Sequence, residues 1–202
     1  MSPEVLFRLS YGLYLLSVRE NGRDNACVIN TAVQVASDPL LLSVSVAKST
    51  LTAQMLAASG RFCLTALSES APFSLFQRFG MQSGRDGDKF AGISGTARSE
   101  DGLLYLTQGN MYLSARVTDR LDLGSHLLFL AEPTHGAVLS DDAPPCTYRY
   151  YQSQIKPRPQ SSGPKKSWVC TVCGYVYEGE EIPEDYLCPL CNHGKEAFVP
   201  LT

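Results

Sequence analysis

Four cysteines near the end of the chain form two Cys-x-x-Cys pairs, Cys170 with Cys173 and Cys188 with Cys191. Each pair can make a tight turn that directs two thiolates toward one point, and two facing turns give a tetrahedral set of four sulfurs. This spacing predicts a metal site. Zinc would make the segment a structural piece, whereas iron in the same cage would carry single electrons. Composition alone leaves both metals open.

The three remaining cysteines, Cys27, Cys63 and Cys146, are scattered through the longer N-terminal part of the chain. An odd total of seven, with four of them clustered, is not the pattern of a disulfide framework. It indicates a reducing compartment and one metal site. We therefore expect the three scattered cysteines to pack as small apolar side chains.

The overall composition restricts the classes of function. The 202-residue chain has a formal net charge of −3, which argues against a nucleic-acid binder, since that class normally presents a basic face. The first residues lack the pattern of a signal peptide, and the longest apolar runs are far too short to cross a bilayer. We expect a cytoplasmic protein that binds neither nucleic acid nor membrane.

One segment divides the chain. Residues 156–166 contain three prolines and four cations but no large apolar side chain, so they cannot bury anything and are typical of an exposed linker. The predicted organisation is therefore a larger domain at 1–155 and a small cysteine-containing domain at 167–202.

The larger part is predicted to be mainly β, because many short runs rich in β-branched, aromatic and leucine residues are separated by turn residues. These runs favour a closed or sandwich-like architecture. The predicted strands are 13–18, 27–35, 40–46, 62–67, 111–118 and 126–131.

Two short helices are expected between these strands. The first, 52–59, would be capped by Thr52 and ended by Gly60, and the second, 72–79, would end at Gly80. A Gly-x-Gly-x-x-Gly motif after a strand is missing from the sequence, which disfavours a dinucleotide-binding Rossmann fold.

The cysteine pairs lie within a longer pattern: Trp168-x-Cys170-x-x-Cys173-Gly174-Tyr175-x-Tyr177, then Cys188-Pro189-x-Cys191 and Phe198. This pattern resembles rubredoxin, and the short spacing between the pairs resembles the form appended to rubrerythrins. The resemblance implies one iron per chain, held by the four cysteines. Asn192 replaces the usual glycine after the fourth cysteine, and asparagine is the next most tolerant residue for positive φ.

Softer motifs run through residues 1–155. They are Ser10-Tyr11-Gly12-Leu13-Tyr14, Asn30-Thr31-x-x-Gln34-Val35-x-Ser37-x-Pro39, Val44-Ser45-Val46-x-Lys48-x-x-x-Thr52, Ser83-Gly84-Arg85-Asp86-x-Asp88-Lys89-Phe90 and Gly124-Ser125-His126-x-Leu128-Phe129. Together they resemble the flavin reductase-like family of FMN-binding split β-barrels. The combined arrangement, a split barrel followed by a small metal-knuckle domain, is similar to that of the high-molecular-weight rubredoxins of anaerobes.

These motifs are also chemically suited to a flavin. The segment from Ser45 to Thr52 supplies hydroxyls, a cation at Lys48 and a helix N-terminus, which match a phosphate group. Residue types alone are equally compatible with solvated surface cations and polar residues before a helix. The resemblance implies a set of FMN-binding residues: Asn30, Thr31, Ser45, Val46, Ala47, Lys48, Thr52, Arg85 and Lys89.

For Asn30, Thr31 and His126 the expected contacts are more specific. Asn30 and Thr31 are predicted on a strand, where they could contact the edge of the isoalloxazine ring. By the same resemblance, His126 lies at the cofactor face and helps to place the nicotinamide of NAD(P)H. Tyr148, Tyr150 and Tyr151 could either line the flavin pocket or close the barrel.

The two resemblances together imply an electron-transfer oxidoreductase. Electrons would pass from NAD(P)H through FMN to the iron and on to a partner, which the resemblance suggests is a flavodiiron reductase of oxygen or nitric oxide. It also implies a homodimer. Two alternatives stay open: a reductase of free flavin or ferric chelates, and a non-enzymatic flavin-binding protein with a structural zinc ribbon. The sequence does not indicate the preference between NADH and NADPH, the redox potentials or the acceptor.

Overall fold

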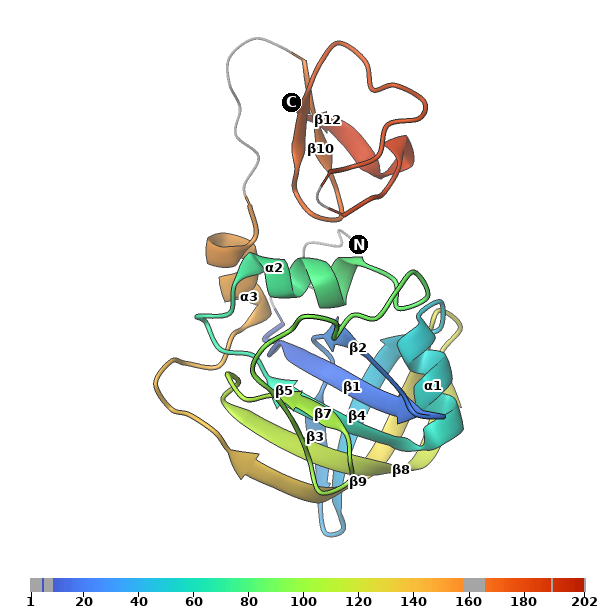
Figure 1. The fold of residues 1–202 in the computed structure, drawn as a ribbon, viewed down its shortest axis with the longest axis vertical. Coiled ribbons are helices and arrows are strands. Elements are labelled where there is room, and N and C mark those ends of the chain that lie inside the picture. The colour runs from blue at the N-terminus through green and yellow to red at the C-terminus, as the bar shows by residue number, and fades with distance from the viewer. Residues whose placement is uncertain (1–4, 6–8, 158–165, 190, 202) are drawn as a thin grey trace.

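The computed structural model describes residues 5, 9–157, 166–189 and 191–201. Its larger part is a strongly curved antiparallel sheet of seven strands in the order β2-β1-β5-β8-β9-β4-β3 (Figure 1). The strands are β1 (Tyr14–Glu20), β2 (Arg23–Ile29), β3 (Val33–Ser37), β4 (Leu40–Ala47), β5 (Arg61–Ala66), β8 (Met111–Asp122) and β9 (His126–Val138). A separate two-stranded ribbon is formed by β6 (Thr96–Arg98) and β7 (Leu104–Leu106). This is the mainly β, split-barrel class that the sequence predicts.

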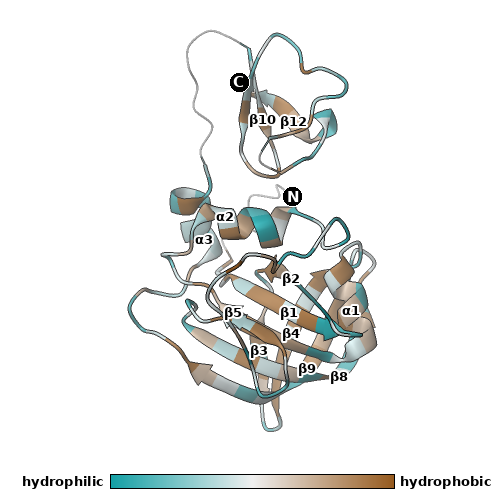
Figure 2. Ribbon diagram, in the orientation of Figure 1, coloured by the Kyte–Doolittle hydropathy of each residue, from teal (hydrophilic) through white to brown (hydrophobic). Residues whose placement is uncertain are grey.

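The main core lies between the curved sheet and the helix α1 (Leu51–Ser59). Phe62, Phe129 and Leu56 are fully buried there. The helix begins at Thr50, whose hydroxyl accepts a hydrogen bond from the backbone N–H of Ala53, and it ends at Gly60 in the left-handed conformation. Figure 2 shows the brown apolar residues gathered along the strands that this core covers.

A second core connects the sheet to a pair of short helical segments. Helix α2 (Phe73–Phe76) continues as the π-helical turn η2 (Gln77–Met81), and α3 (Tyr148–Tyr150) continues as η3 (Tyr151–Ile155). Phe76, Phe79 and Tyr151 are buried between them and the sheet. The rings of Phe76 and Tyr151 lie 4.6 Å apart, centroid to centroid.

The structure corrects four local expectations. The helix cap is Thr50 and not Thr52, which is 1% exposed and faces the core. The second helix does not end at Gly80 but runs on to Met81, since a glycine with an ordinary negative φ does not stop a helix. The predicted strand 27–35 is two strands, β2 and β3. Asn30 and Thr31 therefore lie in the connection between them and not on a strand.

The scattered cysteines are buried, as expected. Cys27, Cys63 and Cys146 each lie in a different apolar cluster of the larger domain. Burial raises the pKa of Cys63 and of Cys146 to about 11. These thiols therefore stay protonated at neutral pH and act as apolar packing groups.

The C-terminal part is a small three-stranded sheet in the order β11-β10-β12. Its elements are β10 (Ser167–Cys170), β11 (Val176–Glu178), the 3-10 turn η4 (Lys195–Ala197) and β12 (Phe198–Leu201). Figure 1 shows this module above α2, on the opposite side of α2 from the curved sheet. Most of the linker predicted at 156–166 lies outside the described residues.

No helix among the residues that the structure describes is both long enough and apolar enough to span a membrane.

Candidate metal centre and flavin site

The four clustered cysteines converge on one point. Their sulfur atoms all lie within 4.8 Å of one another, with Cys170 and Cys191 3.6 Å apart and Cys173 and Cys188 3.4 Å apart. A tetrahedral ion with metal–sulfur bonds of about 2.3 Å separates its ligands by roughly 3.8 Å. The cage therefore fits a single ion, and its all-thiolate donor set suits iron or zinc.

Each Cys-x-x-Cys turn is closed by a residue in the left-handed region. Gly174 has φ 83° and Asn192 has φ 61°. The Gly174 N–H donates to the carbonyl of Cys170, and the Asn192 N–H donates to the carbonyl of Cys188, both at 2.8 Å. The substitution of asparagine for glycine after the fourth cysteine is thus accommodated by the conformation that the sequence predicted.

The surroundings of the cage shield it and favour thiolates. All four cysteines are buried, and Phe198, Trp168 and Tyr177 pack around them. Burial raises the pKa of the Cys170 thiol, but hydrogen bonds from the backbone N–H groups of Cys173 and Val172, together with those from the Cys191 and Cys173 thiols, bring the pKa below its ordinary value. Donors of this kind also set the potential of an iron–thiolate centre.

Several of the predicted flavin residues meet where β4 runs into α1. The Thr31 hydroxyl donates to the carbonyl of Ser45 at 2.7 Å and accepts from the Ser45 N–H, which fixes the β2–β3 connection against β4. Ala47 pairs with His126 on the neighbouring strand β9. The Lys48 N–H donates to the carbonyl of Ser125 at 3.0 Å. Residues from three distant segments of the sequence are therefore brought to one edge of the barrel.

Two exposed cations lie beside the N-terminus of α1. The Arg85 guanidinium donates to the carbonyl of Ser49 at 2.8 Å, and the Lys48 ammonium forms an exposed ion pair with Asp122 at 2.7 Å. Both side chains stay accessible to a ligand. Cations, hydroxyls and a helix N-terminus together are the groups that a phosphate requires, so this cluster fits the phosphate of a flavin mononucleotide.

Three of the predicted side chains instead point into the protein. Val46 and Thr52 are each 1% exposed, and the Thr52 hydroxyl accepts a hydrogen bond from the Asn25 amide. The buried Lys89 ammonium donates to the carbonyls of Ala26 and Phe79 at 3.0 and 3.1 Å. Burial lowers the pKa of Lys89. These contacts give Lys89 a structural role within the domain.

His126 begins β9 and is half-buried at the same edge. Its Nδ1 lies 2.9 Å from the Ser125 hydroxyl. This hydrogen bond orients the ring, and the other ring nitrogen, Nε2, makes no hydrogen bond that the described residues show.

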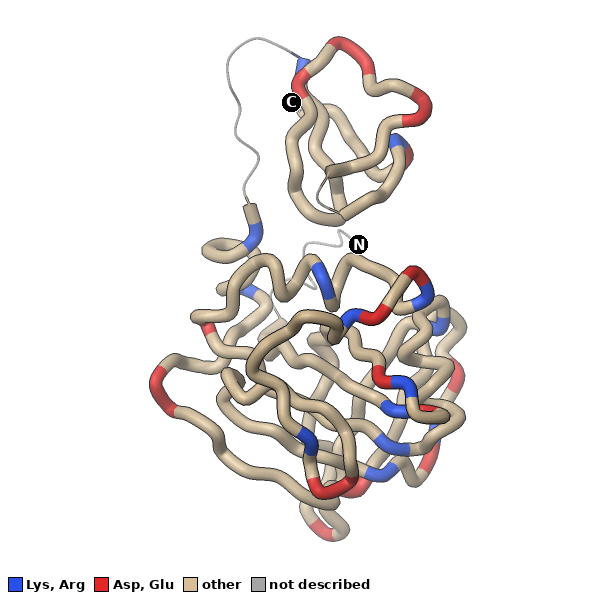
Figure 3. Tube along the Cα trace, viewed as in Figure 1, with Lys and Arg blue, Asp and Glu red and all other residues tan. Residues whose placement is uncertain are grey.

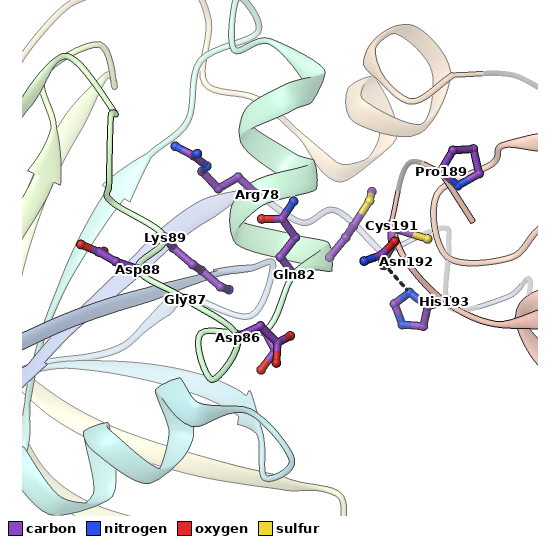
Figure 4. Close-up of a pocket in the computed structure, with 12 residues that line it drawn as sticks. Arg78, Gln82, Asp86, Gly87, Asp88, Lys89, Pro189, Cys191, Asn192 and His193 are labelled. Carbon is purple, nitrogen blue, oxygen red and sulfur yellow. Dashed lines mark hydrogen bonds between the residues drawn. The ribbon is translucent and has the colours of Figure 1, made fainter. Parts of the chain in front are cut away.

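Sequence reasoning missed the surface where the two parts of the chain meet. A cavity of about 370 Å³ has Asn30 and Tyr151 on one side and Val172 of the metal module on the other. A second cavity, of about 620 Å³, lies between Arg78 and the 82–89 loop on one side and Cys191 with its neighbours on the other (Figure 4). Half-exposed apolar residues carry no sequence signal that distinguishes such a surface from an ordinary core edge.

Comparison with known proteins identifies the family of each of the two domains. The family of the flavin reductase like domain matches residues 6–157, and the rubredoxin-like domain of rubrerythrin matches residues 168–199. The chain belongs to the flavin reductase like family and carries a C-terminal rubredoxin-like domain. It is 34% identical to the high molecular weight rubredoxin of Moorella thermoacetica, over 98% of this chain and 99% of that protein.

Other relatives share the larger domain. A ferric-chelate reductase (NAD(P)H) of Archaeoglobus fulgidus is 31% identical over 77% of this chain and 92% of its own length. An FMN-binding protein of Thermus thermophilus aligns with a TM-score of 0.63 at 18% identity, over 89% of this chain and 88% of that one. Flavin reductase HpaC, solved with NADP+, aligns over 72% of this chain and 89% of its own, with a TM-score of 0.63 at 19% identity. The last two show a common fold.

Proposed function

We propose that this protein is an oxidoreductase that passes electrons from NAD(P)H through FMN to a one-iron centre and then to a redox partner. One observation carries the proposal: a four-thiolate cage and a flavin reductase domain occur on the same chain, and one relative shares both over almost its whole length. A donor of electron pairs is thereby combined with a metal that accepts single electrons. Bound FMN supplies the conversion between the two.

The residues of the chain divide this work. Lys48, Arg85 and the N-terminus of α1 hold the phosphate of FMN, while Asn30 and Thr31 contact the ring edge from the β2–β3 connection. His126, oriented through Nδ1 by Ser125, places the nicotinamide against the ring. The donor assignment is supported by two relatives, the ferric-chelate reductase (NAD(P)H) and HpaC with NADP+.

The external acceptor is proposed to be a flavodiiron protein. A segment similar to this domain, 29% identical, forms 23% of a longer diflavin flavoprotein of Synechocystis, so such domains also occur within larger flavoproteins. A homodimer is proposed as the working assembly, because the edge strand β3 leaves Val33 and Val35 more than half exposed. Free thiolate ligands suit a reducing, cytoplasmic location.

Cofactor content and acceptor choice test the proposal. The protein, produced with iron and riboflavin available, is expected to keep FMN through gel filtration, to contain one iron per chain and to oxidise NAD(P)H. Zinc in the cage, or loss of all flavin, would contradict the proposal. Zinc with retained flavin would instead support the non-enzymatic alternative.

The ferric-chelate reductase relative favours one other function, the reduction of soluble ferric chelates. A Cys191→Ser variant, which removes one ligand of the cage, separates the two. If the iron module is an obligatory carrier, the variant loses electron delivery to a protein acceptor but keeps NAD(P)H-dependent reduction of FMN. If ferric chelates are the substrate of the flavin domain, their reduction is unchanged and a protein acceptor is not reduced by either form.

A further inference from the structure

The metal module contacts the larger domain through the face that carries the cysteine turns. Phe73 of α2 and Met81 of η2 pack against the apolar cluster that contains the four cysteines. Both side chains are half-buried. The α2–η2 segment thus has one side in the second core of the flavin domain and the other against the iron site.

Both cysteine turns take part in this contact. Thr171 and Val172, between the first pair of ligands, close the 370 Å³ cavity that also contains Asn30. From the second turn, Pro189, Cys191, Asn192 and His193 face the 620 Å³ cavity. Figure 4 shows these residues opposite Arg78 and Gln82, across the gap between the two parts.

The chain leading into the linker follows the same face. Gly174 is buried, and a Cβ added there would lie 2.7 Å from the Pro157 carbonyl oxygen and 3.3 Å from the Lys156 side chain. Tyr151, a buried residue of the flavin domain, lines the same 370 Å³ cavity as Thr171 and Val172, which lie between the first two cysteine ligands.

The negative charges of the metal module lie away from its contact with the flavin domain. The acidic residues of the module lie mostly in the loop that Figure 3 shows on the far side from the flavin domain. They are Glu178, Glu180, Glu181, Glu184 and Asp185. An iron with four thiolates would itself be anionic, so placing the module's own carboxylates on the far side limits repulsion there. On the flavin-domain side, the 620 Å³ cavity carries two cations, Arg78 and Lys89, beside Asp86 and Asp88.

We propose that the α2–η2 face is the docking surface at which the iron receives its electrons, and that Phe73 and Met81 form its contact with the metal module. In this position the first cysteine turn, which contains Val172, lies beside the cavity that contains Asn30. The inference rests on the proposed function and adds the contact through which electron transfer from flavin to iron takes place within one chain. Oxidation of one NAD(P)H releases one proton and two electrons. An iron held by the four cysteines would accept these electrons one at a time, so the first would have to leave for the partner before the second could be taken up.

Two matched substitutions test the docking surface. Val172→Glu adds a carboxylate to the first turn, whereas Val199→Glu adds the same group on β12, at an exposed residue that lines neither cavity. In the full-length protein with iron and FMN, Val172→Glu is expected to slow iron reduction at least about tenfold while flavin reduction by NAD(P)H keeps its rate. Val199→Glu is expected to match the wild type. Equal iron reduction in both variants would overturn the inference.

A readout independent of activity uses Met81. A short pulse of hydroxyl radicals oxidises accessible methionines, and mass spectrometry then gives the modified fraction of Met81 relative to Met55, which is 3% exposed. Oxidation of Met81 is expected to rise severalfold in Val172→Glu and to stay at the wild-type value in Val199→Glu. An unchanged Met81 in Val172→Glu would show that the contact is not held in solution.

Failure of the docking surface and failure of the proposed function give different results. If the wild type reduces its flavin but never its iron, the proposed electron chain is wrong. If the wild type reduces both and Val172→Glu does so equally well, only the docking surface is wrong. Should Val172→Glu fail to load iron, Phe73→Lys changes the same contact from the flavin domain and is judged by the same two readouts.

Discussion

At the scale of single residues, the iron site depends on two backbone conformations as much as on four sulfurs. Gly174 and Asn192 each adopt positive φ directly after a ligand, and their N–H groups close the two turns. Left-handed backbone costs most L-residues about 1–2 kcal/mol, and only glycine and asparagine adopt it readily. The identity of these two residues therefore controls how firmly the cage is held.

Asn192 offers a direct test of this dependence. Asn192→Gly is expected to bind iron as the wild type does, whereas Asn192→Val is expected to destabilise the module by about 1–2 kcal/mol because valine is strained at φ 61°. The rate of iron loss to a chelator measures the difference. Equal rates of iron loss from the two variants would show that the backbone conformation of residue 192 does not limit the stability of the metal site.

The cations beside α1 are expected to bind the FMN phosphate. Removing one charge-assisted hydrogen bond to a phosphate costs roughly 1–2 kcal/mol, so Lys48→Ala and Arg85→Ala should each weaken FMN binding about tenfold. Arg116→Ala is the matched control, since Arg116 is an exposed arginine paired with Glu132. Fluorescence titration of the apoprotein gives the affinities. Unchanged FMN affinity in both variants would show that the FMN phosphate does not bind at Lys48 and Arg85.

Lys89 is expected to act on stability. Its ammonium donates to two buried carbonyls, so Lys89→Met leaves both without that donor and should lower the free energy of unfolding by about 2–4 kcal/mol. Arg78→Met removes a single partly exposed bond to Ala91 and should cost less than about 1 kcal/mol. Denaturant unfolding at fixed FMN concentration compares them. A loss of FMN affinity without a loss of stability would instead make Lys89 a cofactor ligand.

The lysine also has a defined pH signature. Burial lowers the pKa of Lys89 in the folded state below its ordinary value of 10.5, so the folded protein holds this proton less tightly than the unfolded chain. Stability attributable to Lys89 should therefore increase as pH rises through the window between the two values. The stability difference between wild type and Lys89→Met, followed with pH, shows this slope.

At the scale of elements, the sequence predicted most strands and the helical segments α1 and α2–η2, because alternation and turn residues are local signals. It did not predict the helical segment α3–η3. The predictions from sequence were wrong at positions where contacts between distant segments determine the local structure. The connection at Asn30 and Thr31 interrupts a continuous apolar run, since the Thr31 hydroxyl bonds to β4 where a strand would continue. The choice of Thr50 over Thr52 as helix cap depends on Thr52 facing the core and bonding to Asn25.

The candidate sites differ in the same way. The cysteine cage was predictable because its ligands lie in two short, regularly spaced pairs. The flavin cluster joins residues from β4, β9 and the 83–89 loop, and residue types did not reveal that Lys89 would be buried while Lys48 stays exposed. The docking residues Phe73 and Met81 had no signal at all, because they resemble ordinary half-buried helix positions.

The edge strand β3 is expected to pair subunits. Val33 and Val35 are 58% and 51% exposed on this edge, an arrangement that favours association. A double variant with Val33→Lys and Val35→Lys should be monomeric, whereas Leu187→Lys, at an exposed leucine of the metal module, should keep the oligomeric state. Light scattering after gel filtration measures the mass. A double variant with the mass of the wild type would place the subunit contact elsewhere.

At the scale of the whole molecule, one chain combines a flavin reductase like domain with a rubredoxin-like module, and the described residues place the two in contact. Covalent connection gives an effective concentration of order mM, so transfer between the parts does not depend on a second molecule. The central claim is therefore that iron reduction is intramolecular.

Anaerobic rapid mixing of the full-length protein with NADH tests this claim most directly. Time-resolved spectra follow the flavin and ferric-iron absorbances together. We expect the flavin to be reduced first and the iron colour to bleach afterwards, at a rate that does not change with protein concentration. Iron that stays ferric beside reduced flavin, or bleaching that accelerates in proportion to protein concentration, would contradict this claim.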